Sequence, residues 1–217
     1  MKKYVWTLAA ALLSANALGF SFDDIQLWSG EGSHRAALVI QWNDGGTPTS
    51  LAWGFRFEGT ENTESLLTFS VFSDPRLYLY GGPNGLHGLP VYGLGYDANA
   101  TGVTGDGFTN AGSTPDDATT NDPGGDRWKV GWLTKGFWQL KIGSTGNSAG
   151  TWTDAMTGVT EDLIGDNNWR ALSFASAETG WTAADPTGIA AATAVPEPSI
   201  LLALAAGLAA LARRRKN

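Results

Sequence analysis

The chain has 217 residues, with 29 Gly, ten Trp and no Cys. Many Gly and aromatic residues with few charges favour short strands joined by tight turns over a helical bundle. The lack of Cys excludes disulfide bonds, thiolate metal ligands and a cysteine nucleophile. The formal net charge is −7, and the segment 20–194, with eight basic and twenty acidic residues, carries −12, which argues against nucleic acid as a partner.

Residues 1–19 have the three parts of a secretory signal peptide. Lys2 and Lys3 form the charged start, an apolar stretch runs from Val5 to Leu13, and residues 15–19 offer two small-x-small cleavage sites. We therefore predict that the chain is exported and that the mature protein begins near residue 20.

Strands are predicted where apolar residues run continuously or alternate with polar ones. The clearest is 35–42, whose continuous apolar centre is typical of a strand covered on both faces. Residues 50–58 alternate, so the large apolar side chains should face the core and the alternate residues from Ala52 to Glu58 the solvent. Further strands are predicted at 23–29, 76–80, 89–96, 127–133, 136–142, 151–154 and 168–175.

Residues 61–73 fit a helix better than a strand. Thr60 can cap a helix, Glu61 and Glu64 would fall in its first turn, and Pro75 would end it. The apolar residues also alternate as those of a strand do. Helix versus strand therefore stays open for 61–73, and we favour the helix.

Two stretches are predicted to lack regular structure. Residues 97–126 are rich in Asp, Asn, Gly, Thr and Ala and hold too few apolar side chains to offset the entropy of ordering them. We predict a mobile surface insertion there and a linker of small residues at 182–194. The folded ectodomain is then predicted at 20–181.

These elements predict an α+β fold, mostly β, in which one short helix lies on an antiparallel sheet; an all-β sandwich is the alternative. The succession of Ala37–Gly45, Ser50–Gly59, a candidate helix and late Trp-rich strands resembles an uncharacterised class of secreted bacterial surface domains. Some of these look like the β-grasp modules of cobalamin carriers. The resemblance implies a β-grasp-like fold and transfers no functional residue.

The C-terminal residues have three parts. Two prolines remove backbone donors and disfavour helix, so the first part should be an extended strip. It consists of Val195, Pro196, Glu197, Pro198 and Ser199. Residues 200–212 are apolar and favour a helix, which would rise about 20 Å against roughly 30 Å for a bilayer core and suits a transient stop. The basic tail resists crossing a membrane and consists of Arg213, Arg214, Arg215 and Lys216.

This order of parts resembles the PEP-CTERM sorting signal of Gram-negative bacteria. The resemblance implies an exported protein whose motif is processed by an exosortase, a membrane transpeptidase, and which reaches the cell surface or an extracellular polysaccharide matrix. Residues 195–217 are then the signal, with a transmembrane helix at 200–212. An ordinary membrane anchor is the alternative, and whether the tail is cleaved or retained stays open.

No sequence motif predicts catalysis, and we expect a non-enzymatic protein. His34 and His87 have no Cys or second His at metal-ligand spacing, and Ser33 does not lie in Gly-x-Ser-x-Gly. A Ser-His-Asp triad needs no fixed spacing, however, and paired carboxylates could serve a glycosidase. The candidates for such a pair are Glu31, Glu58, Glu61, Glu64 and Glu161.

No cofactor is expected, with calcium as the weak alternative. Carboxylate oxygens suit calcium, but the acids of 97–126 lack the spaced Asp-x-Asp-x-Asp-Gly pattern, which favours a solvated acidic loop. These acids are Asp97, Asp106, Asp116, Asp117, Asp122 and Asp126.

The tryptophans support a second hypothesis, a surface binding module for polysaccharide or a planar cofactor. Nine of the ten Trp follow residue 19, more than one small core usually holds. Exposed rings could stack on a sugar or on a flat cofactor. Trp28, Trp42 and Trp128 lie opposite the predicted apolar faces or at their ends, and core packing is the expectation for most of the nine.

Overall fold

The computed structural model describes residues 19–85, 88–99 and 107–193. The α-helix of this part is α1 (Thr63–Ser73), and the short 3-10 helices are η1 (Phe22–Asp24), η2 (Pro115–Asp117) and η3 (Ala177–Thr179). The strands are β1 (Trp28–Gly30), β2 (His34–Gln41), β3 (Ser50–Phe57), β4 (Glu61–Asn62), β5 (Leu77–Gly81), β6 (Val91–Tyr96), β7 (Phe108–Asn110), β8 (Ala118–Thr120), β9 (Arg127–Val130), β10 (Phe137–Gly143), β11 (Trp152–Asp154), β12 (Leu163–Ile164), β13 (Asn168–Ala175) and β14 (Ile189–Ala191). The prediction of an α+β fold that is mostly β is confirmed.

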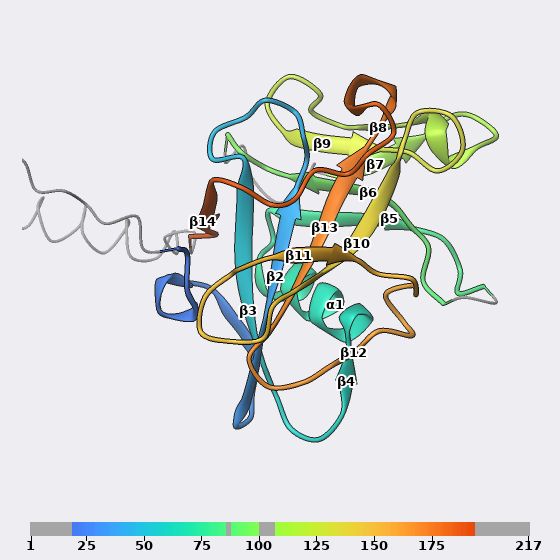
Figure 1. Cartoon of the computed structure of the whole chain (residues 1–217). Coiled ribbons are helices and arrows are strands. Elements are labelled where there is room, and N and C mark those ends of the chain that lie inside the picture. The colour runs from blue at the N-terminus through green and yellow to red at the C-terminus, as the bar shows by residue number, and fades with distance from the viewer. Residues whose placement is uncertain (1–18, 86–87, 100–106, 194–217) are drawn as a thin grey trace, which may run out of the picture.

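A seven-stranded sheet is the largest element of the fold (Figure 1). Its strands lie in the order β1-β3-β2-β13-β10-β11, and β14 also pairs with β3. The pairs β1–β3, β2–β13 and β3–β14 are parallel, and the pairs β2–β3, β10–β13 and β10–β11 are antiparallel. The sheet is therefore mixed rather than antiparallel throughout, because β13 and β14 return to it from distant parts of the chain.

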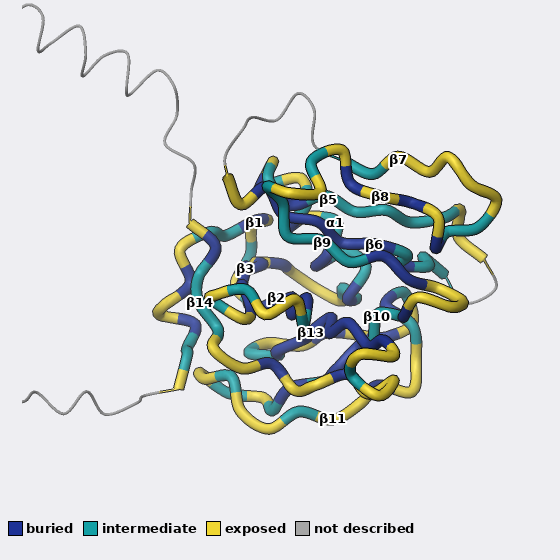
Figure 2. Tube along the Cα trace, turned by 90° about the horizontal axis from the view of Figure 1, so that it is seen from above, coloured by how far each residue is buried: buried dark blue, intermediate teal, exposed yellow. Residues whose placement is uncertain are grey.

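The three-stranded sheet β5-β6-β9 and α1 cover one face of the large sheet. Figure 1 shows the strands of the small sheet running across those of the large one, and Figure 2 shows the two layers. The main core lies between them. Fully buried side chains from every layer meet there, which stabilises the fold without a disulfide. Examples are Leu38, Trp53, Leu66, Leu67 and Leu94.

A second, smaller core covers the opposite face of β2 and β3. Phe22 and Ile25, from the first described residues, pack there with Ala52 and Trp169. The ring of Phe22 lies 4.5 Å from that of Trp169, centre to centre. The N-terminal segment therefore closes a face of the sheet that would otherwise be open to solvent.

This cover corrects the prediction for the alternate face of β3. Arg56 and Glu58 are exposed as expected, whereas Ala52 and Gly54 are buried. The Trp28 indole lies on Gly54, where an added Cβ would come within 2.4 Å of the ring. The alternating pattern placed Ala52 and Gly54 on the solvent face. In the structure their small size allows the N-terminal segment to pack against β3, with the Trp28 ring on Gly54.

The helix prediction for residues 61–73 is confirmed, with a later start. Glu61 and Asn62 form β4 and pair with β12, which keeps them extended. Asn62, rather than Thr60, caps the helix, because its side-chain oxygen accepts a hydrogen bond of 2.9 Å from the backbone N–H of Ser65. The helix therefore starts at Thr63, later than predicted, because β4 pairs with β12 from a distant part of the chain.

Two other predicted strand regions differ from the structure. Within residues 23–29 only the end is a strand, since η1 occupies the start and β1 begins at Trp28. The strands β9 and β10 follow each other closely in the chain yet belong to different sheets: β9 pairs with β6, and β10 with β13 and β11. Residues 131–136 therefore connect the two layers.

The prediction of a mobile insertion at 97–126 is wrong for residues 107–126, while residues 100–106 lie outside the described part. β7 and β8 form a hairpin, and Asp116, Ala118 and Thr120 are buried. Hydrogen bonds to side chains order much of this stretch, and the Phe108 ring packs against aromatic rings of the small sheet. Asp117, for example, accepts bonds from the backbone N–H groups of Ser113 and Thr114.

The predicted linker at 182–194 is also part of the fold as far as residue 193. β14 pairs with β3, and Ala183 and Ala192 are buried. Small residues fit closely against the sheet here, which composition alone did not distinguish from a linker. We call residues 182–193 the C-terminal strap.

Candidate functional site

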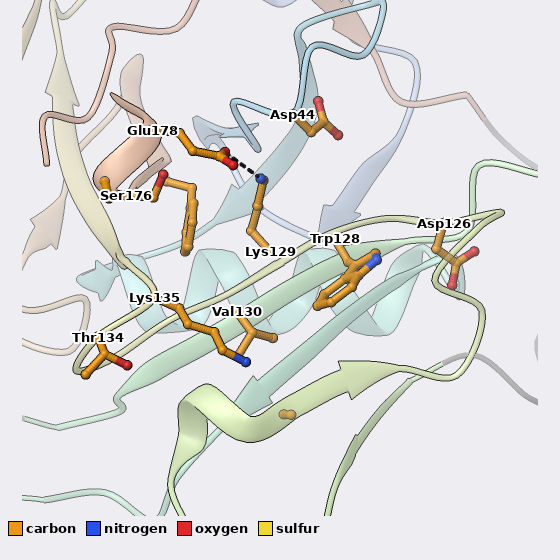
Figure 3. A pocket seen from close by; sticks show the side chains of 12 residues that line it. Asp44, Asp126, Trp128, Lys129, Val130, Thr134, Lys135, Ser176 and Glu178 are labelled. Carbon is orange, nitrogen blue, oxygen red and sulfur yellow. Dashed lines mark ion pairs between the residues drawn. The ribbon is translucent and has the colours of Figure 1, made fainter. Parts of the chain in front are cut away.

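Two hollows open on either side of the connection between β9 and β10. One has a volume of about 640 Å³ and the other about 720 Å³, within the range of small-ligand sites. The first, which we call the polar hollow (Figure 3), is lined by residues that include Asp44, Asp126, Trp128, Lys129, Lys135 and Glu178. The second, the aromatic groove, is lined by residues that include Tyr92, Trp132, Trp138, Gln139, Met156 and Thr157.

Opposite charges meet in the polar hollow. The Lys129 ammonium points toward Glu178 and lies 3.8 Å from its carboxylate (Figure 3). The same ammonium lies 5.8 Å from the centre of the Phe174 ring. The Glu178 side chain is 82% exposed, so the ion pair contributes little stability. The mixture of charges does not favour one class of ligand.

Asp126 lies in the polar hollow in an unfavourable position for a charge. Its Oδ2 accepts hydrogen bonds from the Tyr78 and Thr120 hydroxyls at 2.7 and 3.1 Å, whereas its Oδ1 is buried without a partner among the described residues. Burial raises the pKa of Asp126, the two hydrogen bonds oppose the rise, and the charges of Asp97 and Asp122 add to it. Such a shift occurs at functional and structural acids alike.

Aromatic side chains from both sheets form the walls of the aromatic groove. Tyr92 of β6 contacts Trp132, which follows β9, edge to face with ring centres 5.0 Å apart. Trp138 of β10 contacts Phe174 of β13 in the same manner at 5.2 Å. Trp132 is 47% exposed and Met156 is 96% exposed. The groove therefore presents ring surface and a flexible thioether to the solvent.

The position of Trp132 depends on Asp116, a buried residue of η2. The Asp116 carboxylate accepts the backbone N–H groups of Trp132, Leu133 and Thr134 at 2.6, 3.1 and 2.6 Å, and the Thr134 hydroxyl at 2.9 Å. Burial by itself would raise the pKa of Asp116, but these bonds outweigh burial and hold the pKa below its usual value. A residue predicted only as a weak calcium ligand thus fixes the loop that carries Trp132.

The polar groups of the aromatic groove are few and uncharged. Gln139 Nε2 donates to the carbonyl oxygens of Leu140 and Ala155 at 2.9 and 3.3 Å. Trp138 Nε1 is buried and has no hydrogen-bond partner in the described part of the chain. None of the described residues that line the groove carries a charge.

The histidines and the serine considered for catalysis have structural contacts where they are described. Ser33 donates its backbone N–H to Glu58 at 2.6 Å. The His34 ring, at the start of β2, packs 5.4 Å from that of Phe57. His87 lies outside the described residues.

The other candidate glutamates lie in two places. Glu31 is exposed in the turn before β2, whereas Glu61, Glu64 and Glu161 belong to the region where β4, α1 and the segment before β12 meet. Glu64 accepts a hydrogen bond from the Thr160 hydroxyl. This contact links the first turn of the helix to the chain before β12.

The acids considered for calcium have separate roles where they are described. Asp116 fixes the loop after β9, Asp117 caps η2, and Asp122 accepts the backbone N–H of Gly125. Asp97 is buried, and Asp106 lies outside the described residues. Across 19–85, 88–99 and 107–193, no group of three or more His, Cys, Asp or Glu residues could hold a metal ion.

The tryptophans divide between core and surface. Trp42, Trp53 and Trp169 are fully buried, whereas Trp132 and Trp181 are 47% and 48% exposed. Core packing is therefore confirmed for Trp42, at the end of β2, and its exposure is excluded. The sequence did not single out Trp132, because its exposure depends on a loop held by a distant aspartate.

The comparison with known families finds a PEP-CTERM protein-sorting motif at residues 194–216. The chain therefore carries this sorting motif at its C-terminal end, which supports processing by an exosortase and export toward the cell surface. No curated protein and no solved structure was found to match the chain. The resemblance to secreted surface domains and β-grasp modules stays a prediction.

Both predicted targeting signals lie outside the described residues. These are the signal peptide through residue 18 and, at the other end, the motif residues Val195–Ser199, the apolar stretch 200–212 and the basic tail 213–216. Within the described ranges, no helix is long and apolar enough to cross a membrane. The strap is attached to the fold as far as its last residue, since Arg76 donates a hydrogen bond to the Thr193 carbonyl.

Proposed function

We propose that this chain is a non-enzymatic component of the cell surface or extracellular matrix, exported through its N-terminal signal peptide and sorted through its C-terminal motif. The match of residues 194–216 to the sorting motif carries the proposal. In this scheme an exosortase recognises Val195–Ser199, residues 200–212 lie transiently in the inner membrane, and the basic residues 213–216 stay on the cytoplasmic side.

The attachment of the C-terminal strap supports a close placement of the ectodomain beside the processing enzyme. Ala192 is buried, and its N–H donates to the Ala52 carbonyl at 2.9 Å. Only Thr193 and Ala194 separate Ala192 from Val195. The folded ectodomain therefore ends within a few residues of the motif, without a long spacer.

The structural use of the candidate acids supports a non-enzymatic role. Glu58 holds the backbone of Ser33, Glu64 holds Thr160, and Asp116 holds the loop after β9. Each of these carboxylates thus stabilises a turn or a junction between elements.

The proposal is tested by the intact mass of the mature protein from its native host, together with its location in cell fractions. We expect a chain that begins near residue 20 and ends within or next to Val195–Ser199, in the surface or matrix fraction. A Pro196→Ala/Pro198→Ala variant should keep its tail and stay in the inner membrane. A wild-type mass that still includes Arg213–Asn217 would contradict sorting and indicate a retained anchor. A deletion strain with unchanged surface and matrix would contradict the structural role.

The second candidate function is a binding module for polysaccharide or a planar cofactor. The aromatic groove favours it, because Trp132 exposes a ring beside Tyr92. Tryptophan fluorescence during titration with glycans and with a corrinoid tests this function, and an unchanged spectrum throughout would argue against it. Turnover of any of these compounds would contradict the non-enzymatic role.

A further inference from the structure

We propose that the aromatic groove binds an uncharged glycan chain, with Trp132 and Tyr92 as stacking surfaces and the Trp138 ring as part of its wall. The inference rests on the binding-module function given above and chooses between its two ligand classes.

The rings of Trp132 and Tyr92 suit the faces of sugar rings. They stand edge to face, 5.0 Å apart, so each presents a surface of different orientation. Rings set at an angle fit successive units of a twisted chain, whereas one flat cofactor would contact only one of them face to face. Tryptophan and tyrosine provide such surface with little loss of side-chain entropy on binding.

The described lining of the groove offers no charge to pair with a strongly charged ligand. None of the described residues that line it is charged, while the segment 20–194 as a whole carries −12. An anionic polysaccharide would meet repulsion without a compensating cation, and a basic peptide would find no acidic partner in the groove itself. A neutral, hydroxyl-rich chain meets neither penalty.

Trp138 contributes ring surface to the wall of the groove. Its Nε1 is buried and has no partner within the described residues, so a ligand in the groove does not reach this atom. Tyr92, Gln139 and Thr157 give the described lining uncharged polar groups, which suit glycan hydroxyls.

The size of the groove agrees with a short glycan segment. Its volume of about 720 Å³ lies toward the upper part of the range for small-ligand sites. Met156 lines the groove and its side chain is exposed. It can change rotamer to fit a ligand, because an unbranched thioether has many accessible conformations.

Binding of the mature protein to neutral hexa-oligosaccharides of β-1,4-glucose, β-1,3-glucose and α-1,4-glucose, by calorimetry and Trp fluorescence, tests the inference. Oligogalacturonate is the anionic comparator and a corrinoid the planar one. We expect saturable binding of at least one neutral oligosaccharide and none of the comparators. Trp132→Ala should weaken it about tenfold or more, whereas Trp138→Phe, which keeps a ring and removes only a buried N–H, should bind like the wild type.

Trp181→Ala is the matched control, because Trp181 is as exposed as Trp132 and does not line either hollow. It should bind like the wild type, and the melting temperatures of all three variants establish that they are folded. Equal loss in Trp181→Ala, full binding by Trp132→Ala, stronger binding of oligogalacturonate or binding of the corrinoid alone would each overturn the inference. Failure of glycan binding would leave the intact mass and the sorting untouched, so it is distinguishable from failure of the proposed function.

Discussion

The Lys141 ammonium lies 2.9 Å from a carboxylate oxygen of Asp185, 44 residues further along the chain. It also lies 2.7 Å from the carboxylate of Asp154 on the neighbouring strand. The lysine side chain is 5% exposed, whereas the two acids are 61% and 58% exposed. One buried cation thus fastens both β11 and the C-terminal strap to β10.

This arrangement predicts strongly non-additive effects of removing the two acids. Asp154→Asn or Asp185→Asn alone should lower the free energy of unfolding by at most about 1 kcal/mol, because the other exposed acid still pairs with Lys141. The double variant leaves a buried charge without a counter-charge and should lose about 2–4 kcal/mol. Urea denaturation followed by Trp fluorescence measures each value.

A matched control for these variants is Glu178→Gln, which removes the exposed partner of Lys129 at 3.8 Å. It should change the stability by less than about 0.5 kcal/mol. Additive effects of Asp154→Asn and Asp185→Asn would contradict the shared role of Lys141.

The same contact predicts a loss of stability at high pH. Burial alone would lower the pKa of Lys141, but the hydrogen bonds and charges of Asp154 and Asp185 raise it above 10.5. A raised lysine pKa stabilises the fold fully below the unfolded value, and this contribution is lost as the pH rises through the folded pKa. Wild type should therefore lose more stability above pH 10.5 than Lys141→Met, in which the titrating group is absent.

The sequence predicted the elements that depend on local patterns and missed those that depend on distant partners. The strand at 35–42 and the helix at 61–73 were recognisable from continuous apolar runs and end signals. The strap was not, because its order comes from pairing with β3 and from Lys141, far away in the chain. A stretch of small residues without periodicity is typical of a linker, and the sequence does not indicate that it pairs with β3.

The aromatic groove shows the same limit. The surplus of tryptophans predicted a binding surface, but nothing local distinguished the exposed Trp132 from the buried Trp42. The difference lies in Asp116, which fixes the loop after β9 from a segment with the composition of disorder. Hydrogen bonds from a buried carboxylate to backbone groups leave no periodic signal in a sequence.

Asp116→Asn is predicted to destabilise the protein and to disturb the aromatic groove. The amide cannot accept all the backbone N–H groups that the carboxylate holds, so we expect a loss of about 2–3 kcal/mol. Because the folded pKa of Asp116 is depressed, its contribution is present above the unfolded pKa near 3.8 and is lost as the pH falls through the folded pKa. Denaturation at neutral pH and at a pH below the depressed folded pKa of Asp116 should show the difference from wild type only at the higher pH.

Asp117→Asn tests whether the effect is specific to the buried carboxylate. Asp117 is the exposed neighbour that caps η2, so its variant should lose about 1 kcal/mol or less. Equal losses for the two variants would contradict the role assigned to Asp116.

Gly54→Ala is predicted to push Trp28 from the second core. The new Cβ would come within 2.4 Å of the indole, and overpacking of this kind costs about 1–3 kcal/mol. In a Trp28→Ala background the ring is gone, so the same substitution should cost much less. Gly124→Ala, where no atom lies within 4 Å of the new Cβ, is the control and should be close to neutral. Equal cost of Gly54→Ala with and without Trp28 would show that the backbone, and not the ring, requires the glycine.

Asp126→Asn is predicted to stabilise the protein at neutral pH, in contrast to Asp116→Asn. Burial and the charges of Asp97 and Asp122 disfavour the charged form of the Asp126 carboxylate and raise its pKa, whereas an asparagine is uncharged and its oxygen can still accept from Tyr78 and Thr120. A gain of a few tenths to about 1 kcal/mol is expected. Because the folded pKa lies above the unfolded 3.8, wild type binds more protons when folded in the window between these two values. The stability of wild type relative to Asp126→Asn should therefore rise as the pH falls from neutral into that window, so the advantage of the variant should shrink there. A variant that is less stable than wild type at neutral pH would instead mean that the carboxylate has a favourable partner in the native protein, such as a cation bound in the polar hollow.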